Sequence, residues 1–374
     1  MKGVGPRLRF FSDNCGKAME NRMARKTDKF EEYVAHEPLG TIANISAWNY
    51  AYFVGCNVFL PALLTGNSVL YKPSEHSTLT GLNITKLLHK AGVPEDVFTP
   101  IIGDGIIGDN LLDHELQGVF FTGSNNTGLK IANKASKKLM RTQLELGGKD
   151  PTYVTNDVVD VVNVAKSLAD GAMYNTGQSC CSVERIYVHS SIYDKFVDTF
   201  VNEVKSFVIG DPNDDKTYIG PLALSTQPKF LKDQVDNAVK LGGKVLTGGN
   251  IINKPGNWFE PTVIVNVNHK MDVMRFESFG PIIGIQKVES DEEAIELMND
   301  THYGLTSGVY SNNKERAIKI LNKIKSGTVY WNACDRVSPF VPWSARNYSG
   351  IGSTLGTEGI SPFLFTKSFH LINP

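Results

Sequence analysis

The sequence is poor in cysteine, has no surplus of charge of either sign and contains no long apolar run. Its 374 residues include five cysteines, and 38 lysines and arginines stand against 39 acidic residues. A sparse, odd set of cysteines in a long chain is not a disulfide framework, so we expect a reducing compartment. Since no large excess of cations is present to contact phosphates, the charge balance argues against a nucleic-acid-binding protein.

The most apolar stretch, residues 52–66, is interrupted by Asn57 and Pro61. It is too short to cross a bilayer, and residues 1–11 contain no long apolar run of the kind found in a secretory signal. Hydrophobic residues nevertheless make up 41% of the chain, enough to bury a core, and the length favours two domains. We therefore expect a soluble, cytoplasmic protein with no membrane segment.

Several catalytic signatures are also absent from the sequence. There is no G-x-S-x-G elbow and no G-x-x-x-x-G-K-[ST] phosphate loop. His114-Glu115 lacks the second histidine of a zinc H-E-x-x-H motif, and no C-x-x-C pair occurs, so no metal site is predicted. The eight histidines are scattered, which gives a Cys–His hydrolase no local support, while a pairing created by the fold stays open.

From residue 41 onward, short β-rich runs alternate with amphipathic helical stretches. The strands predicted in the first half are 41–47, 68–72, 98–102 and 118–122, with helices over 53–64 and after Ser77. A second cycle follows Gly148, with strands over 151–155 and 185–189 and helices over 157–174, opened by Asp157, and 193–207. Such alternation predicts doubly wound α/β structure, in which helices cover both faces of a parallel sheet.

Three smaller patterns complete this prediction. Ser290 and Glu293 have the spacing of a capping box before a helix. Gly147-Gly148 is the most plausible domain hinge. Residues 365–372 show the alternation that is typical of an edge strand, and such a strand needs a partner strand.

A literal G-x-G-x-x-G motif spans residues 103–108, after a predicted strand. A dinucleotide-binding motif of this kind requires an acidic residue at the end of the next strand. Here that strand ends in Phe121-Thr-Gly-Ser-Asn-Asn126, which contains no acid. An ordinary glycine-rich turn is therefore favoured at this position.

Two other strand ends carry polar groups that suit a dinucleotide. Lys72-Pro-Ser-Glu75 follows one strand, where an ammonium and a carboxylate could hold a ribose, although a solvated turn has the same composition. Gly123-Ser124 precedes a helix whose free amides suit a pyrophosphate. Each signal is moderate when it is taken alone.

A candidate nucleophile lies in Asn175-Thr-Gly-Gln-Ser-Cys180-Cys181, a polar segment near the end of a helix. Thiolates are strong nucleophiles, although an isolated cysteine is more often a small core residue. Glu145 lies between leucines, where burial raises a carboxyl pKa towards values that suit a general base. Asn49, after the first strand, offers an amide donor to an oxyanion.

Taken together, these motifs resemble the aldehyde dehydrogenase superfamily, in the family's order and with compatible spacing. The similarity runs from about residue 30 to the C-terminus. The segments that carry it are Trp48-Asn-Tyr50, Lys72-Pro-Ser-Glu75, Phe121-Thr-Gly-Ser124, Glu145-Leu-Gly-Gly-Lys149, Asn175-Thr-Gly-Gln-Ser-Cys180 and Glu277-Ser-Phe-Gly-Pro281.

The resemblance implies an NAD-dependent oxidation of an aldehyde to a carboxylic acid through a cysteine thiohemiacetal and thioester. It implies that Cys180 is the nucleophile, that Asn49 holds the oxyanion and that Glu145 activates water. The remaining residues implied to bind NAD are Trp48, Lys72, Ser74, Glu75, Gly123, Ser124, Gly147, Glu277 and Phe279. Because Glu75 would repel a 2′-phosphate, we expect NAD in preference to NADP.

The resemblance also implies a Rossmann-like cofactor domain, a second α/β catalytic domain and a small β arm for a homo-oligomer, either a dimer or a tetramer. The expected boundaries are 1–26 for a residual N-terminal helical segment, 27–38 and 362–374 for the arm, 39–147 for the NAD domain and 148–361 for the catalytic domain.

The chain departs from the family's pattern in three places. Ala51 stands where the family usually has proline, and residues 339–350 replace a more glycine-rich loop. Only 48 residues precede Asn49, so we expect part of the usual N-terminal region to be missing. Two alternatives remain. The first is a truncated, weakly active or inactive homologue that serves as a binding or assembly subunit, and the second is an enzyme that passes the acyl group to coenzyme A.

Overall fold

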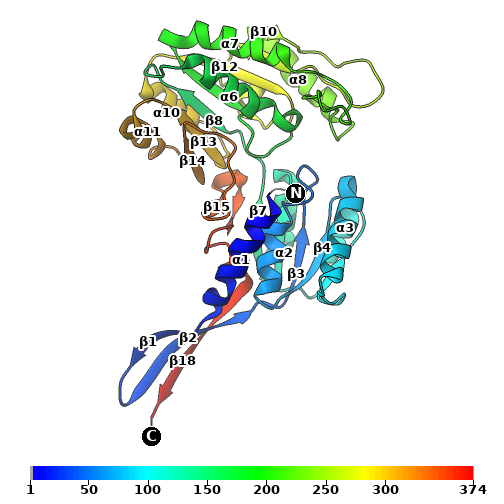
Figure 1. Ribbon diagram of the computed structural model, residues 1–374, viewed down its shortest axis with the longest axis vertical. Coiled ribbons are helices and arrows are strands. Elements are labelled where there is room, and N and C mark those ends of the chain that lie inside the picture. Colours follow the sequence, from blue (N-terminus) through cyan, green and yellow to red (C-terminus); the bar gives the residue numbers. More distant parts are fainter. Residues whose placement is uncertain (1–2, 374) are drawn as a thin grey trace. The chain divides into compact units, whose positions relative to one another are not determined.

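The computed structural model describes residues 3–373, and these form two compact units. The first contains the described residues up to Leu146 together with Val337–Ser344 and the residues from Gly350 onward, and the second contains Gly147–Arg336 and Ala345–Ser349 (Figure 1). Residues 337–344 and 350–361, which the sequence analysis assigned to the catalytic domain, therefore pack in the first unit. The reason is strand pairing, since Gly350 and Ile351 pair antiparallel with Glu145 and Leu144.

The first unit is built on a six-stranded sheet in the order β16-β7-β6-β3-β4-β5. Its strands are β3 (Thr41–Ile45), β4 (Ser68–Lys72), β5 (Phe98–Pro100), β6 (Gly118–Thr122), β7 (Arg141–Glu145) and β16 (Gly350–Ile351). All pairings among β3 to β7 are parallel, and only β16 runs antiparallel to its neighbour. The chain moves outward from β3 through β4 to β5 and then crosses back to β6, so the strand order reverses between β3 and β6.

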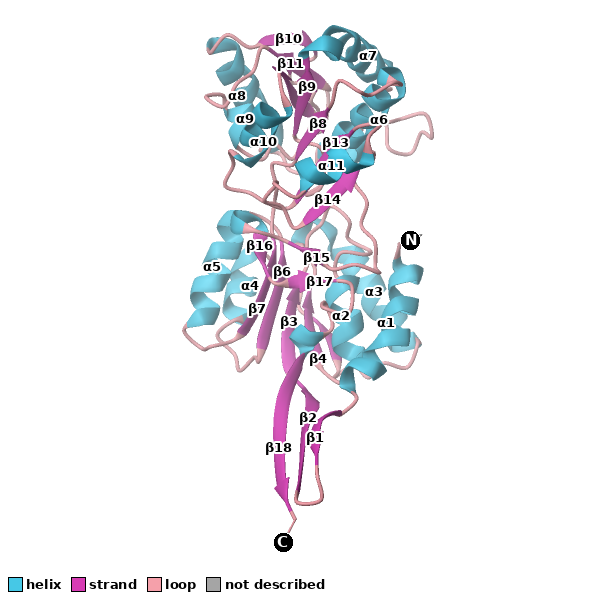
Figure 2. Cartoon of the chain, turned by 90° about the vertical axis from the view of Figure 1, so that its left-hand side faces the viewer, coloured by secondary structure: helices cyan, strands magenta, loops and turns pink. Residues whose placement is uncertain are grey.

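Helices cover both faces of this sheet, with α4 and α5 on one side and α1, α2 and α3 on the other (Figure 2). They are α1 (Val4–Met19), α2 (Cys56–Leu64), α3 (Thr78–Lys90), α4 (Gly105–Leu111) and α5 (Asn125–Ser136). Strands β3, β4 and β6 are mostly buried, as parallel strands covered on both faces must be, whereas β5, β7 and β16 are only partly buried. The prediction of doubly wound α/β structure is confirmed.

The second unit contains a seven-stranded sheet in the order β10-β11-β12-β9-β8-β13-β14. Its strands are β8 (Pro151–Val154), β9 (Arg185–His189), β10 (Lys244–Thr247), β11 (Thr262–Val265), β12 (Ile282–Val288), β13 (Thr306–Tyr310) and β14 (Thr328–Trp331). Only the edge strand β10 is antiparallel to its neighbour.

Two apolar cores lie on opposite faces of this second sheet. One includes side chains of α6 and α7, and the other includes side chains of the remaining four helices. The helices are α6 (Val161–Met173), α7 (Tyr193–Ser206), α8 (Gln227–Lys240), α9 (Asp272–Arg275), α10 (Asp291–Asn299) and α11 (Lys314–Leu321).

One predicted helix start is wrong. Asp157 was expected to open the helix over 157–174, but α6 begins at Val161 and is capped by Asp160, whose carboxylate accepts from the backbone N–H of Asn163. The Asp157 carboxylate instead accepts from the hydroxyl groups of Thr155 and Ser311. Asp157 is thus engaged by Ser311, which follows β13 (Thr306–Tyr310), and by nearby Thr155, and the other aspartate caps the helix.

A separate three-stranded antiparallel sheet joins β1 (Arg22–Lys26), β2 (Phe30–Pro38) and β18 (Leu364–Ile372). In the described chain β18 pairs with β2 alone, which confirms the predicted C-terminal edge strand. The side chains of this sheet are mostly exposed or partly exposed, and Tyr33 stacks on Phe369 with ring centroids 4.6 Å apart. No helix among residues 3–373 is long and apolar enough to cross a membrane.

Candidate active site

Every candidate residue of the first unit follows the carboxyl end of a parallel strand. Trp48 and Asn49 come after β3, the Lys72–Glu75 segment after β4 and Gly123-Ser124 after β6, while Glu145 ends β7. Parallel strands place these ends at one edge of the sheet, and ligands of open α/β sheets bind where the strand order reverses. That reversal lies between β3 and β6.

Lys72 and Glu75 form a close pair at this edge. The Lys72 side chain is 4% exposed and its Nζ lies 3.8 Å from a carboxylate oxygen of Glu75, whose side chain is 45% exposed. Burial lowers the pKa of Lys72, and attraction to Glu75 partly opposes that shift. Ser74 fixes the turn by accepting a hydrogen bond from the backbone N–H of His76 at 3.3 Å. An anchored ammonium therefore lies next to a carboxylate that remains accessible to hydroxyl groups.

The turn after β6 leads directly into α5. The Ser124 hydroxyl caps this helix by accepting from the backbone N–H of Thr127 at 3.4 Å. Gly123 donates its N–H to the carbonyl of Glu145 at 3.1 Å, and a Cβ at Gly123 would lie 2.4 Å from the ring of Phe121. The turn is compact because glycine occupies this position.

The G-x-G-x-x-G segment is an ordinary turn, as expected. Asp104 caps α4, and its carboxylate accepts from the backbone N–H groups of Ile106 at 2.9 Å and Ile107 at 3.4 Å. A carboxylate of the chain itself thus occupies the donors that a phosphate would need.

Glu145 carries the polar group at the end of β7 and is partly buried. Its carboxyl accepts hydrogen bonds from the hydroxyl group of Thr354 and, at 3.3 Å, from the amide of Gln143. Burial raises the pKa of Glu145 to about 7, although these two donors and the charge of Arg7 act in the opposite direction. The expected rise is therefore present, and the carboxyl exchanges protons close to neutral pH.

In the second unit, Cys180 follows a strained turn. Asn175, Thr176 and Gly177 all have positive φ, at 51°, 58° and 68°. Cys180 is partly exposed, whereas Cys181 is buried and donates its thiol proton to Asp335 Oδ1 at 3.2 Å. The hydrogen bond with Cys180 and burial both raise the pKa of Cys181. Of the two adjacent thiols, Cys180 is therefore the more accessible one.

Gly177 has no room for a side chain. A Cβ there would lie 2.3 Å from the carbonyl oxygen of Gly280, a backbone atom. We expect Gly177→Ala to lower the free energy of unfolding by at least about 1–2 kcal/mol, from the left-handed conformation alone. The urea unfolding curve measures this loss. Gly220→Ala is the matched control, since a Cβ there makes only contacts of 3.6 Å and longer, and an equal loss in both variants contradicts the strain argument.

Glu277 lies against the glycine pair that begins the second unit. Its Oε1 accepts from the backbone N–H of Gly148 at 3.1 Å, and a Cβ on Gly147 would lie 2.0 Å from Oε2. Burial, followed by repulsion from Glu184, raises the pKa of Glu277 to about 8. A Cβ on Gly148 would lie 3.1 Å from the carbonyl oxygen of Cys180, so the second unit brings Gly147, Cys180 and Glu277 together.

A buried ion pair, missed by sequence reasoning, supports the loop that carries Glu277 and Phe279. Lys149 Nζ lies 2.5 Å from Glu184 Oε2, and the Glu184 carboxylate accepts from the N–H groups of Ser278 at 3.1 Å and Phe279 at 3.0 Å. Phe279 itself has a φ of 48°. In the sequence, Glu184 is recognisable as a charged residue directly before the predicted strand 185–189, and this position does not indicate which residue it pairs with.

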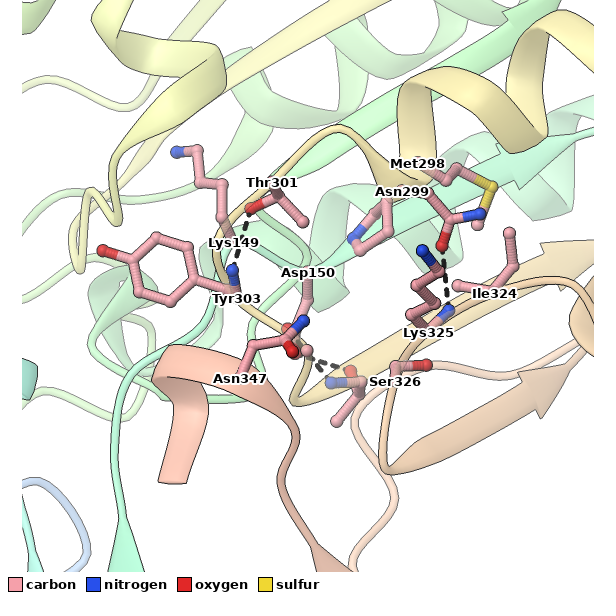
Figure 3. A pocket seen from close by; sticks show the side chains of 13 residues that line it. Lys149, Asp150, Met298, Asn299, Thr301, Tyr303, Ile324, Lys325, Ser326 and Asn347 are labelled. Carbon is pink, nitrogen blue, oxygen red and sulfur yellow. Dashed lines mark hydrogen bonds between the residues drawn. The ribbon is translucent and has the colours of Figure 1, made fainter. Parts of the chain in front are cut away.

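Next to Lys149, a small hollow of the second unit is lined by polar residues, among them Asp150, Thr301, Tyr303 and Asn347, and by apolar ones such as Met298 and Ile324 (Figure 3). Asp150 accepts from the backbone N–H of Thr306 at 3.1 Å and from its hydroxyl group at 2.6 Å. Burial raises the pKa of Asp150 to about 8. These hydrogen bonds hold the segment that follows the glycine pair. Among residues 3–373 no group of three or more metal-binding side chains is present.

Comparison with known proteins agrees with this architecture. Residues 4–369 match the model of the aldehyde dehydrogenase family. The chain is 35% identical over 344 residues to the peroxisomal aminoaldehyde dehydrogenase 1 of Pisum sativum, covering 91% of this chain and 68% of that protein.

Two solved structures show the same fold. The betaine aldehyde dehydrogenase of Staphylococcus aureus in complex with NAD+ has a TM-score of 0.94 and 32% identity, over 99% of this chain and 74% of that one. An NADP-dependent enzyme of E. coli has a TM-score of 0.95 and 26% identity, over 99% and 77%. The fold and the order of the motifs define an α/β dehydrogenase architecture. The chain belongs to the aldehyde dehydrogenase family.

Proposed function

We propose that the protein oxidises an aldehyde to a carboxylic acid with reduction of NAD. The observation that best supports this function is that the chain retains a partly exposed thiol, Cys180, and a carboxyl, Glu145, whose pKa of about 7 suits a general base.

The residues at the carboxyl edge of the first sheet fit a dinucleotide. In this proposal Lys72 and Glu75 bind the adenosine ribose, the amides at the start of α5 bind the pyrophosphate with Ser124, and Glu277 of the second unit binds the nicotinamide ribose. Trp48, Ser74, Gly123, Gly147 and Phe279 complete the proposed binding residues. The dinucleotide supplies, when bound, a nicotinamide ring that accepts a hydride.

The chemical steps follow from the chain's own groups. The Cys180 thiolate attacks the aldehyde carbon, and the electron pair of the C=O π bond moves to the oxygen, which becomes an oxyanion stabilised by the Asn49 amide and the Cys180 N–H. Once hydride has left, the carbon stays attached to the sulfur as a thioester. Glu145 takes a proton from water, the hydroxide adds to the thioester carbon, and the sulfur leaves as a thiolate.

This function is tested with a panel of aldehydes, by following the absorbance of NADH and identifying the product. We expect the free acid to form, because Glu145 is equipped to activate water. Formation of an acyl-coenzyme A only when coenzyme A is added supports the alternative acyl transfer. Clean NAD binding without turnover of any aldehyde supports a binding or assembly role and contradicts the proposal.

Glu75 leads to a prediction about the choice of cofactor. The native protein is expected to have a higher kcat/KM with NAD than with NADP, because a carboxylate repels a 2′-phosphate. Glu75→Gln is expected to lower the ratio of kcat/KM with NAD to kcat/KM with NADP by about 10- to 100-fold. Glu95→Gln is the matched control, since this exposed carboxylate lies before β5, at the opposite edge of the sheet. Equal or better efficiency of the native protein with NADP contradicts the assignment.

We further propose a homo-oligomer, a dimer or a tetramer, whose subunits associate through the sheet of β2 and β18. Support comes from the exposed position of these strands and from the free edge of β18. Light scattering measures the mass in solution, and a monomeric mass contradicts this assignment. Localisation in the cytoplasm stays a prediction, since the relative from Pisum sativum is peroxisomal.

A further inference from the structure

Phe279, one of the residues proposed to bind NAD, has a strained backbone conformation. Its φ of 48° lies in the left-handed region, where a bulky side chain is an outlier. The residue belongs to the segment 276–281, which connects α9 to β12. Such strain persists only where the surrounding structure holds the residue from several sides. The contacts that hold Phe279 therefore show which residues shape this segment.

The Glu184 carboxylate accepts hydrogen bonds from two successive backbone N–H groups of the segment. Its Oε1 accepts from Phe279 at 3.0 Å, and its Oε2 accepts from Ser278 at 3.1 Å. Glu184 is 3% exposed and directly precedes β9, the middle strand of the second sheet. A buried carboxylate that is anchored at the centre of a sheet thus fixes both peptide groups.

The carbonyl groups of the same two residues are held from α8. The side-chain amide of Gln227 donates to the carbonyl of Ser278 at 2.6 Å and to that of Phe279 at 3.4 Å. Farther along the same helix, Gln234 Oε1 accepts from the Ser278 hydroxyl group at 2.8 Å. Side chains from the sheet and from one helix therefore bind the N–H and the C=O of both residues.

Lys149 holds the Glu184 carboxylate in place. Its Nζ lies 2.5 Å from Glu184 Oε2 and donates to the Ser278 hydroxyl group at 2.9 Å. Burial lowers the pKa of Lys149, and attraction to Glu184 opposes that shift. Replacing a buried ion pair by apolar side chains of similar volume is often neutral or stabilising, so stability alone does not account for this pair. Its hydrogen bonds to Ser278 and Phe279 give it a further role.

Glu277 is connected to this ion pair from both sides. It directly precedes Ser278, and its Oε1 accepts from the backbone N–H of Gly148 at 3.1 Å. Lys149 is the residue after Gly148. The Glu277 backbone is thus held next to Glu184, and the partner of its carboxyl group is held next to Lys149.

We propose that Glu184, held by Lys149, is a positioning residue for the nicotinamide end of NAD. Its carboxylate keeps Ser278 and Phe279 in the conformation that presents Glu277 and Phe279 to the cofactor. Glu184 does not itself touch the cofactor. This inference rests on the proposed function, and it adds the residues that preorganise the segment before NAD binds.

Two double variants separate the hydrogen bonds of Glu184 from its charge. Lys149→Met with Glu184→Gln retains an oxygen that accepts from the two N–H groups, and Lys149→Met with Glu184→Leu retains none. Both lack the ion pair, and neither leaves a buried ammonium without a partner. We expect the Glu184→Gln double variant to bind NAD within about threefold of the native protein and the Glu184→Leu double variant to bind it about 10-fold more weakly, because a segment that only partly adopts the binding conformation lowers the affinity by that fraction.

Calorimetric titration gives the Kd for NAD, and AMP is the control ligand. AMP contains the adenosine ribose assigned to Lys72 and Glu75 but no nicotinamide, so its Kd is expected to be equal in the native protein and in both double variants. In steady-state kinetics the KM for NAD is expected to rise about 10-fold with Glu184→Leu, while the KM for the aldehyde does not change.

Arg316→Met with Asp291→Asn is the matched control for the loss of an ion pair from the second unit. Arg316 Nη2 lies 2.7 Å from Asp291 Oδ1, and the pair joins α11 to α10. We expect a lower melting temperature and an unchanged Kd for NAD. Glu184→Asp is the variant to use if the Glu184→Leu double variant does not fold, because it keeps the charge but is one methylene shorter. It is also expected to weaken NAD binding about 10-fold.

Three results overturn the proposal. The first is native affinity for NAD in the folded Glu184→Leu double variant or in Glu184→Asp. The second is an equal loss in the Glu184→Gln and Glu184→Leu double variants, and the third is an equal loss in the Arg316 control.

The binding measurements do not depend on turnover, so they separate this inference from the proposed function. If NAD binding follows the expected pattern but no aldehyde is oxidised, the oxidation fails and the positioning role of Glu184 stands. If aldehydes are oxidised and every variant binds NAD as the native protein does, the positioning role fails alone.

Discussion

Cys180→Ala is expected to lower kcat for aldehyde oxidation by about 10⁴- to 10⁶-fold, the loss that follows removal of a covalent nucleophile. Without the sulfur no thiohemiacetal forms, and the later steps have no substrate. NAD binding should persist, since none of the residues proposed to hold the cofactor is changed. NADH formation under saturating aldehyde and equilibrium binding of NAD measure the two effects separately.

Cys181→Ala is the matched control for this experiment. Cys181 is buried and hydrogen-bonded to Asp335, and its hydrogen bond with Cys180 together with burial raises its pKa, so the thiol is neutral and inaccessible. We expect its loss to reduce kcat by less than about tenfold, through packing of the turn. If Cys181→Ala is inactive and Cys180→Ala is active, the nucleophile is the other thiol.

Glu145→Gln is expected to lower the steady-state rate of aldehyde oxidation by about 100- to 10,000-fold, which is the range of general base catalysis. The amide keeps the shape of the carboxyl but accepts no proton from water, so the thioester accumulates. A rapid burst of NADH close to one equivalent per active site, followed by slow turnover, is the expected time course. Loss of the burst together with the steady state would show that Glu145 acts before the thioester forms.

The same carboxyl sets a pH dependence whose direction follows from its ionisation. Burial raises the pKa of Glu145 to about 7, and the ionised form is the base, so kcat is expected to fall as the pH drops through 7. Thr354→Val removes a donor that lowers this pKa, and the acid limb of the profile should then move to higher pH. In Glu145→Gln the limb should vanish. An unchanged limb in that variant assigns the titration to another group.

Much of the fold could be predicted from local pattern, because parallel strands buried on both faces are short apolar runs. The bounds of β4, β6 and β9 agree with the predicted ranges 68–72, 118–122 and 185–189. The helix over 53–64 begins only at Cys56, since the residues after Asn49 form turns. The residue at which such a helix begins depends on the path of the chain after the preceding strand, and hydrophobic periodicity does not predict that path.

Candidate site residues could be proposed from the sequence where they lie in motifs at strand ends, as Lys72, Ser124 and Glu145 do. Their supporting contacts were not readable, because they join residues far apart in the chain. Thr354 reaches Glu145 across 209 positions, and Ser278 reaches Glu184 across 94. No local spacing predicts that two such residues meet; that depends on strand order.

The pairing of β2 with β18 has a consequence for biosynthesis. Lys367 and Glu37, which form an ion pair across these strands, are 330 positions apart, and β7 gains its neighbour β16 only from residue 350 onward. The first unit thus needs segments that are translated before and after the second unit, whereas nearly all of the second unit is continuous. The second unit is therefore able to fold first, while β2 has β1 as its sole neighbour in the described sheet and keeps one edge unpaired until β18 is synthesised.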